Sequence, residues 1–240
     1  MLVVTLFAWP AVAQVGGIPA FNVNEGDNGS TYSLSLQILA LMTALTLLPS
    51  LVLGMTSFTR IIIVLSILRQ AMGTQQTPPN QVLVAIALFL TFFIMAPTFT
   101  TLNDTVLAPY LDGQLSAEVA LADGTAVMKE FLVQNTRVND LVMFTEMVGD
   151  EPYADAQAVP LNVLLPAFIT SELKTAFQIG FLLFLPFLVI DMVIASILMS
   201  LGMMMLSPML VALPFKLLLF VLVDGWAMTV GSLVATYSVT

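Results

Sequence analysis

The fold is decided by residues 176–226, AFQIGFLLFLPFLVIDMVIASILMSLGMMMLSPMLVALPFKLLLFVLVDGW, in which two long apolar runs flank a short turn. The first run covers 176–200 and the second runs from 209 to about 235, so each has the roughly 20 apolar residues that a membrane-spanning helix needs. Between them, residues 201–208 contain a glycine and a proline, which are typical of turns. We therefore expect a hairpin of two membrane-type helices.

The rest of the chain has the same character. Two further apolar blocks cover 34–53 and 82 to about 102, and only 9% of the 240 residues are charged, against roughly a quarter in soluble domains. An apolar run at 61–68 prolongs the earlier block, and one straight helix over both would be about 50 Å long. We expect a kink near Pro49 or a broken helix pair there. The predicted fold class is all-α, an integral membrane protein of helical hairpins with kinked and broken helices.

Charge and residue usage exclude several classes of function. The net charge is −9, with no cysteine and no histidine, which removes disulfides, thiol nucleophiles, imidazole bases and the usual zinc ligands. We predict no enzyme activity, no cofactor and no metal site, and no nucleic acid partner because a basic surface is lacking. The acidic residues gather in one stretch: Asp104, Asp112, Glu118, Asp123, Glu130, Asp140, Glu146, Asp150, Glu151 and Asp155.

The N-terminus has the pattern of a signal peptide. Residues 1–13 form an apolar run that ends in Ala-Val-Ala, the small-x-small pattern of a cleavage site, so we predict cleavage between Ala13 and Gln14. The alternative is an apolar tail that is never cut. Residues 14–33, rich in Gly, Asn and Ser, then form an irregular exported segment.

The remaining chain divides into three parts. Arg60 and Arg69 place the connector 57–80 in the cytoplasm by the positive-inside rule, and the acidic stretch outside. Apolar residues at helical intervals in that stretch predict two or three extracytoplasmic helices. The expected parts are a first helical hairpin over 34–103, an acidic extracytoplasmic segment over 104–160, and a second hairpin over 161–240 that holds the methionine loop 201–208.

Three charged residues lie inside apolar helices, namely Asp191, Lys216 and Asp224. Such charges are costly in lipid and normally have partners. If 201–208 is a tight turn, Asp191 lies about 15 Å before the turn along one helix and Lys216 about 12 Å after it along the other. The two can therefore form an ion pair, within the hairpin or between subunits. A proton relay through Asp191 or Asp224, as in an ion-coupled transporter, is the functional alternative. Because one lysine cannot pair with both aspartates, Asp224 needs another partner, such as a backbone donor or a neighbouring chain.

The segment TSELKTAFQIG at 170–180 predicts the start of a helix. Thr170 or Ser171 can cap it, and Glu172 would lie in the first turn, where the helix dipole favours an acid. A role for Glu172 or Lys174 between subunits is the alternative.

Met203, Met204 and Met205 admit three interpretations. They can line a hairpin turn, which the residues alone favour; they can bind Cu(I), although no cysteine or histidine accompanies them; or they can provide deformable packing. In the third case a ring of thioethers could close a pore to ions and part for a polypeptide.

Two long segments resemble the FliP family of the type III secretion export gate. They are MTSFTRIIIVLSILRQAMGTQQTPPNQVLVAIALFLTFFIMAP at 55–97 and FITSELKTAFQIGFLLFLPFLVIDMVIASILMSLGMMMLSPMLVALPFKLLLFVLVDGW at 168–226. Virulence-type members share GMMM, LPFK and DGW, whereas GTQQTPPNQ and TSELKTAFQIGF are more similar to the flagellar branch. Ser207-Pro208 departs from the two prolines of many members.

The resemblance implies a polypeptide-conducting pore without enzyme activity, located in the bacterial inner membrane within the flagellar basal body. It implies a homo-oligomer, expected to be a pentamer, that joins FliQ and FliR, works with FlhA-type and FlhB components, and conducts unfolded export substrates. In the family the assembled complex lies largely above the membrane plane. An ion-coupled transporter and a scaffold that only templates assembly are the other hypotheses.

The resemblance also suggests roles for individual residues. Met203, Met204 and Met205 match a methionine gasket at the constriction. Asp191, Lys216 and Glu172 match charges that hold helices and neighbouring subunits together. Phe131 and Phe144 match aromatic subunit contacts of the extracytoplasmic region.

Overall fold

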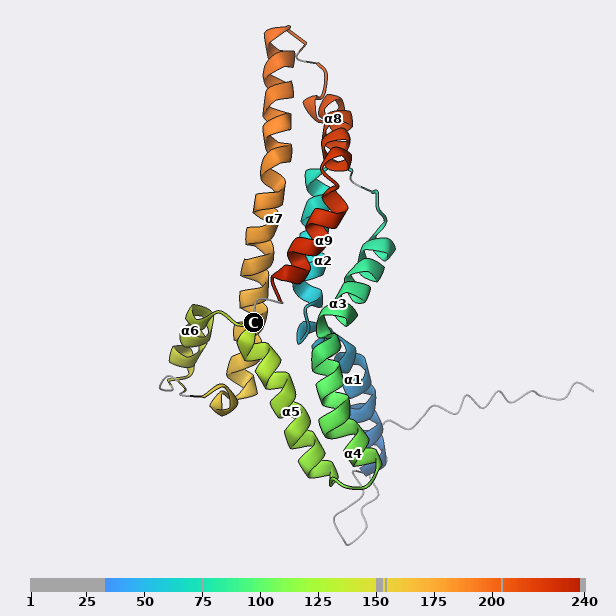
Figure 1. Cartoon of the computed structure of the whole chain (residues 1–240), viewed down its shortest axis with the longest axis vertical. Helices are drawn as coiled ribbons and strands as arrows, with labels where there is room; N and C mark the ends of the chain where they lie inside the picture. Colours follow the sequence, from blue (N-terminus) through green and yellow to red (C-terminus); the bar gives the residue numbers. More distant parts are fainter. Residues whose placement is uncertain (1–32, 75, 150–152, 154, 204, 238–240) are drawn as a thin grey trace, which may run out of the picture. The chain divides into compact units, whose positions relative to one another are not determined.

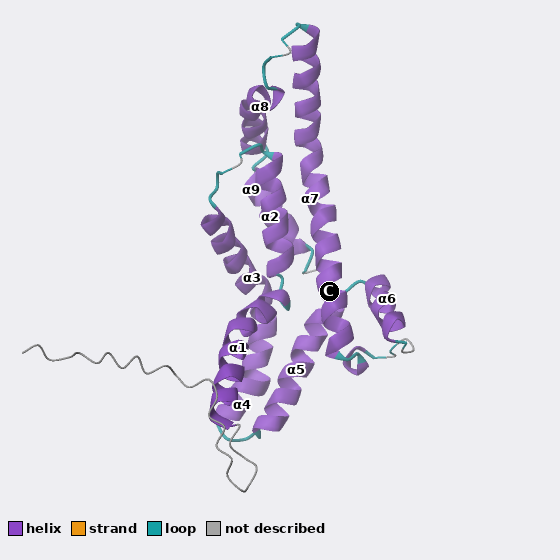
Figure 2. Cartoon of the chain, turned by 180° about the vertical axis from the view of Figure 1, so that it is seen from behind, coloured by secondary structure: helices purple, strands orange, loops and turns teal. Residues whose placement is uncertain are grey.

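The computed structural model describes residues 33–237 except 75, 150–152, 154 and 204, and the described chain is helical with no strand (Figure 2). This confirms the all-α fold class. The predicted signal peptide and its Ala13–Gln14 cleavage site lie outside the described residues. The main helices are α1 (Ser33–Gly54), α2 (Phe58–Ala71), α3 (Asn80–Leu102), α5 (Ala117–Gln134), α6 (Val138–Val148), α7 (Leu161–Ser200), α8 (Pro208–Leu222) and α9 (Gly225–Ala235). Shorter turns are η1 (Asn103–Leu107), α4 (Ala108–Leu111) and η2 (Ala156–Ala158).

The chain divides into two compact units, residues 1–50 and 51–240. Of the two alternatives for the first apolar block, the structure shows the broken helix pair. The break follows Gly54, where the Thr56 hydroxyl donates to the carbonyl of Leu53 at 2.9 Å, and Pro49 lies inside α1. A helix, α2, therefore fills most of the expected connector 57–80.

Helices α2 and α7 run parallel and form the centre of the second unit (Figure 1). Arg60 contacts Glu172 near the start of α2, and Ile67 contacts Gly180 about two turns further along both helices. The buried side of α2 carries Ile61, Val64, Leu65 and Leu68, the spacing of one helix face. Helix α3 packs against the other side of α2 through Leu83 and Ala87.

Helix α7 begins earlier than the sequence indicates. The predicted start at Thr170 or Ser171 is wrong, because α7 begins at Leu161, directly after Pro160. The Ser171 hydroxyl instead accepts a hydrogen bond from the backbone N–H of Arg137, at the start of α6. With 40 residues, α7 is about 60 Å long, about twice the thickness of a bilayer's hydrocarbon core.

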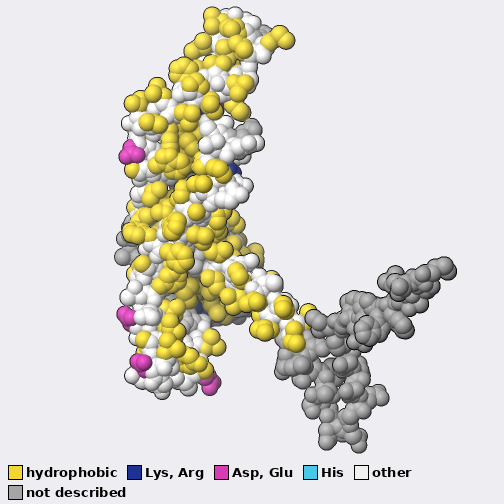
Figure 3. All heavy atoms as spheres, turned by 90° about the vertical axis from the view of Figure 1, so that its right-hand side faces the viewer, with side chains coloured by type: hydrophobic (Ala, Val, Ile, Leu, Met, Phe, Trp, Pro, Cys, Tyr) yellow, Lys and Arg dark blue, Asp and Glu magenta, His cyan; other side chains and the backbone are white. Residues whose placement is uncertain are grey.

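Length and composition suit these helices to a membrane. Among the described residues, the continuous stretches Asn80–Leu111 and Leu161–Ser200 are each long and apolar enough to cross one, and counting two bent helix pairs raises the number to four. Hydrophobic side chains cover much of the face seen in Figure 3, with acidic side chains at only a few places. The acidic stretch folds mainly into α5 and α6, so helices are found where they were predicted.

Candidate functional site

The methionine loop joins α7 to α8 and is fixed at both ends. Gly202 has φ 72°, which favours glycine, and the N–H groups of Gly202 and Met203 donate to the carbonyls of Met199 and Leu198. This is the Schellman motif that closes a helix. Pro208 then starts α8, where proline is favoured.

The loop lies at the far end of α7, beyond the ends of α2 and α3, in both views (Figures 1 and 2). Met203 is 45% exposed and Met205 is fully exposed, whereas Met204 lies outside the described residues. The structure therefore presents at least two thioether side chains outward from the tip of a hairpin. Neither contributes to the core of this chain.

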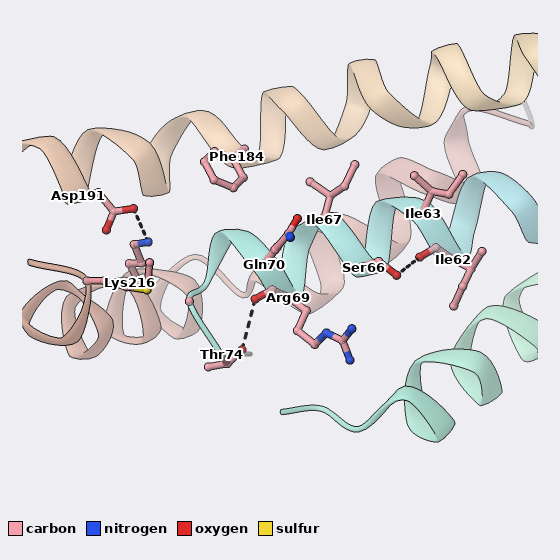
Figure 4. A pocket seen from close by; sticks show the side chains of 12 residues that line it. Ile62, Ile63, Ser66, Ile67, Arg69, Gln70, Thr74, Phe184, Asp191 and Lys216 are labelled. Carbon is pink, nitrogen blue, oxygen red and sulfur yellow. Dashed lines mark hydrogen bonds and ion pairs between the residues drawn. The ribbon is translucent and has the colours of Figure 1, made fainter. Parts of the chain in front are cut away.

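An ion pair supports the hairpin below the loop (Figure 4). Lys216 Nζ lies 2.6 Å from Asp191 Oδ2 and also donates to the carbonyl of Ala71 at 3.1 Å. Ala71 is the last residue of α2, where carbonyl groups lack partners within the helix and attract cations. The structure thus brings Asp191 and Lys216 together within the hairpin, and the buried ammonium group joins α2, α7 and α8. The other oxygen, Asp191 Oδ1, is buried without a hydrogen-bond partner.

A groove of about 630 Å³ lies beside this ion pair. Its lining is mainly apolar, with Ile67 and Phe184 facing it from α2 and α7 (Figure 4). Arg69 also lines it and donates to the carbonyl of Pro78 and to Asn80 Oδ1, which fixes the connector before α3. Besides its apolar surface, the groove is lined by the polar or charged side chains of Ser66, Arg69, Gln70, Thr74, Asp191 and Lys216.

Asp224 lies at a sharp corner between α8 and α9, whose axes differ by 63°. It has φ 50° and an exposed side chain that does not cap α9. A Cβ atom on the next residue, Gly225, would lie 2.2 Å from the ring of Phe220, so only glycine fits against that ring. Trp226 meets Phe220 edge to face at 5.4 Å. In the described chain, no ion pair joins Asp224 to Lys216.

Glu172 belongs to a second buried charge cluster, and its side chain is 0% exposed. Arg60 binds it with two parallel hydrogen bonds, from Nε to Oε2 at 2.9 Å and from Nη2 to Oε1. The Tyr237 hydroxyl donates to Oε2 at 2.5 Å. Burial and the charge of Glu172 raise the pKa of Tyr237, so its hydroxyl stays protonated and remains a donor. The described partners of Glu172 are Arg60 and Tyr237, and its role between subunits stays a prediction.

The two candidate aromatic contacts lie in one apolar cluster. Phe131 is buried, stacks on Tyr237 with ring centroids 6.4 Å apart, and tilts against Phe168 at 6.2 Å. Phe144 is half-buried and packs against the same cluster. Both rings thus pack within the chain, and their role between subunits stays a prediction.

Sequence reasoning missed Arg60 and Tyr237 as site residues. Arg60 was interpreted as a loop charge, yet it is 4% exposed inside α2. Its position directly before the apolar run 61–68 was the available signal, because a charge there needs a partner. Nothing local indicated Tyr237, which is 177 positions away from Arg60 in the chain yet lies 3.9 Å from it, measured from Arg60 Cζ to the ring centroid.

Comparison with known proteins identifies the family. The FliP family model matches residues 41–233. The flagellar biosynthetic protein FliP of Cereibacter sphaeroides is 73% identical over 221 residues, which cover 92% of this chain and 73% of that protein. The FliP of Pectobacterium carotovorum subsp. carotovorum is 52% identical over 97% of this chain and 90% of its own length. The FliP of Bacillus subtilis (strain 168) is 48% identical, and the match covers 90% of this chain and 98% of that protein.

These relatives are all named as flagellar proteins, in agreement with the flagellar branch indicated by the sequence. The chain therefore belongs to the FliP family of flagellar export proteins, which are components of the export apparatus and not enzymes.

Proposed function

We propose that several copies of this chain, expected to be five, form a ring in the bacterial inner membrane at the flagellar basal body. The ring provides the path by which unfolded flagellar proteins leave the cytoplasm. FliQ and FliR complete the gate, and FlhA-type and FlhB components deliver substrates to it. In this proposal Met203, Met204 and Met205 form the gasket at the narrowest point.

The observation that carries the proposal is the exposed methionine loop at the tip of the α7–α8 hairpin. Met203 and Met205 project from a turn whose two ends are fixed by Gly202 and Pro208. Methionine side chains are flexible and apolar, so a ring of them can close against ions and adapt to any passing polypeptide. The ion pair of Asp191 and Lys216 holds the two arms of the hairpin together below the loop.

The exposed apolar surface supports assembly into a larger complex. Between residues 177 and 199, α7 exposes Phe177, Phe181, Leu182, Leu188, Val189, Met192, Val193, Ile197 and Met199. Soluble monomers rarely leave contiguous patches of this kind uncovered, so lipid or neighbouring subunits must cover them. No observation favours an ion-coupled transporter, because Asp191 is neutralised by Lys216 and Asp224 lies at an exposed corner.

Replacement of Met203, Met204 and Met205 by alanine tests the gasket. We expect the cells to leak small ions through the gate while export continues in part, because the constriction widens but the path remains. The measurement is ion flux across the membrane together with the amount of secreted flagellin. Alanine at Met147 and Met228, which are exposed on α6 and α9, is the matched control. Ion-tight membranes with normal secretion in the triple variant would refute the gasket.

A further inference from the structure

The end of the described chain lies against the buried pair of Arg60 and Glu172. Arg60 Nη1 donates to the Thr236 hydroxyl at 3.0 Å, and the Tyr237 hydroxyl donates to Glu172 Oε2 at 2.5 Å. The guanidinium also lies over the Tyr237 ring, 3.9 Å from its centroid, in a cation–π contact. Two consecutive residues after α9 thus contact both members of an ion pair that lies between α2 and α7.

In these contacts both carboxylate oxygens of Glu172 and the Thr236 hydroxyl have hydrogen-bond partners. Glu172 Oε2 accepts from both Arg60 and Tyr237, while Oε1 accepts from Arg60. The Thr236 hydroxyl accepts from Arg60 and donates to the carbonyl of Leu233 at 2.7 Å, so it is used in both directions. A buried charge pair without such additional partners is expensive to maintain. The residues after α9 therefore belong to the cluster and are not a loose tail.

The fully buried face of helix α9 is narrow. Its buried positions are Gly225, Thr229 and Leu233, spaced by four, so only one large apolar side chain faces the core. The Thr229 hydroxyl donates within α9, to the carbonyl of Gly225. Met228 is exposed, and Trp226, which is 38% exposed, meets Phe220 of α8. A helix with so narrow a buried face depends on what holds its two ends.

The α8–α9 segment is held at two places, one within α8 and one just after α9. Lys216 fixes α8 to Ala71 and Asp191, and Tyr237 fixes the end of α9 to Arg60 and Glu172. Along α7, Glu172 and Asp191 are separated by about 28 Å at 1.5 Å per residue. Both anchor points join α2 to α7, and Leu233 of α9 packs in the core cluster that contains Ile61 of α2.

We infer that Thr236 and Tyr237 form a C-terminal latch, in which the buried Arg60–Glu172 pair holds the end of α9 against α2 and α7. The latch, rather than the apolar face of α9, keeps the lower half of the second hairpin in place. It assigns Glu172 to a contact within one chain. The inference goes beyond the proposed pore and does not depend on it, because it concerns the folding of a single chain.

Tyr237→Phe is the sharpest test, because it removes one hydroxyl and keeps the ring that stacks on Phe131 and Arg60. The measurement is amide hydrogen exchange of the full chain purified in detergent. We expect the amides of α9 to exchange about tenfold faster or more, the effect of losing a hydrogen bond to a charged group. Exchange in α5 and α6 should be unchanged. Tyr110→Phe is the matched control, because Tyr110 is exposed on α4.

Combination with Glu172→Gln tests whether Tyr237 acts through Glu172. If it does, adding Tyr237→Phe to Glu172→Gln should change the exchange of α9 much less than Tyr237→Phe does alone. Unchanged α9 exchange in Tyr237→Phe would overturn the latch. Equal acceleration in every helix would also overturn it, because Tyr237 would then be an ordinary core residue.

Discussion

Lys216 shows how far single residues can be placed from the sequence. Its pairing with Asp191 followed from the length of two helices and the position of a turn, because a tight hairpin fixes which residues lie side by side. Its second partner, the carbonyl of Ala71, comes from a helix 145 residues away and could not be derived in that way. The Arg60–Glu172 pair, separated by 112 residues, was missed for the same reason.

Lys216→Met should destabilise the protein by about 2–3 kcal/mol, because it leaves a carboxylate and a helix-end carbonyl without their donor. Asp191 is 37% exposed, and its access to solvent keeps the loss below that of a fully buried pair. The measurement is thermal unfolding in detergent. Lys129→Met, at a half-buried lysine that donates to the carbonyl of Gln157, serves as the control and should lose less stability, because it leaves no carboxylate without its partner. Adding Asp191→Leu to Lys216→Met should recover stability; a further loss in the double variant would contradict this account.

At the scale of elements, apolar blocks located the helices, but their ends depended on contacts that the sequence does not show. The segment at 170–172 has the residues of a helix start, yet it lies inside α7, well after its start at Leu161, where Ser171 accepts from the N–H of Arg137 and Glu172 binds Arg60. Polar residues inside a buried helix and residues at a helix start look alike when their partners are unknown. The break after Gly54 was easier, because one straight helix over that block was implausibly long.

Gly180 controls the distance between α2 and α7. A Cβ atom there would lie 2.4 Å from Cδ1 and 3.0 Å from Cγ2 of Ile67, so Gly180→Ala should cost about 1–3 kcal/mol through overpacking. Gly231→Ala on α9 has open space and should be neutral or slightly stabilising. Thermal unfolding of both variants checks this. Shortening the opposing side chain with Ile67→Ala should suppress the cost of Gly180→Ala, and an equal cost in both backgrounds would exclude the close approach as its cause.

Across the whole molecule, the buried ion pairs and the exposed apolar side chains lie in different places. Arg60 pairs with Glu172 and Lys216 pairs with Asp191 inside the second unit, whereas the exposed part of α7 after residue 176 and the methionine loop are almost entirely apolar. Composition predicted a membrane protein, and only the resemblance to a family suggested a ring, because a single chain carries no direct record of its symmetry. The proposed ring therefore requires that the methionine loop lines the path of the exported polypeptide.

That claim is tested most directly by crosslinking a substrate during export. The chain has no cysteine, so Met203→Cys and Met205→Cys each introduce a single reactive thiol. An export substrate is stalled in the gate by a folded domain fused to its end, and it carries one cysteine in the segment inside the gate. We predict disulfide adducts between the substrate and positions 203 and 205, and none with Met228→Cys on α9. Adducts at position 228 but at neither loop position, with the substrate held in the gate, would contradict the account.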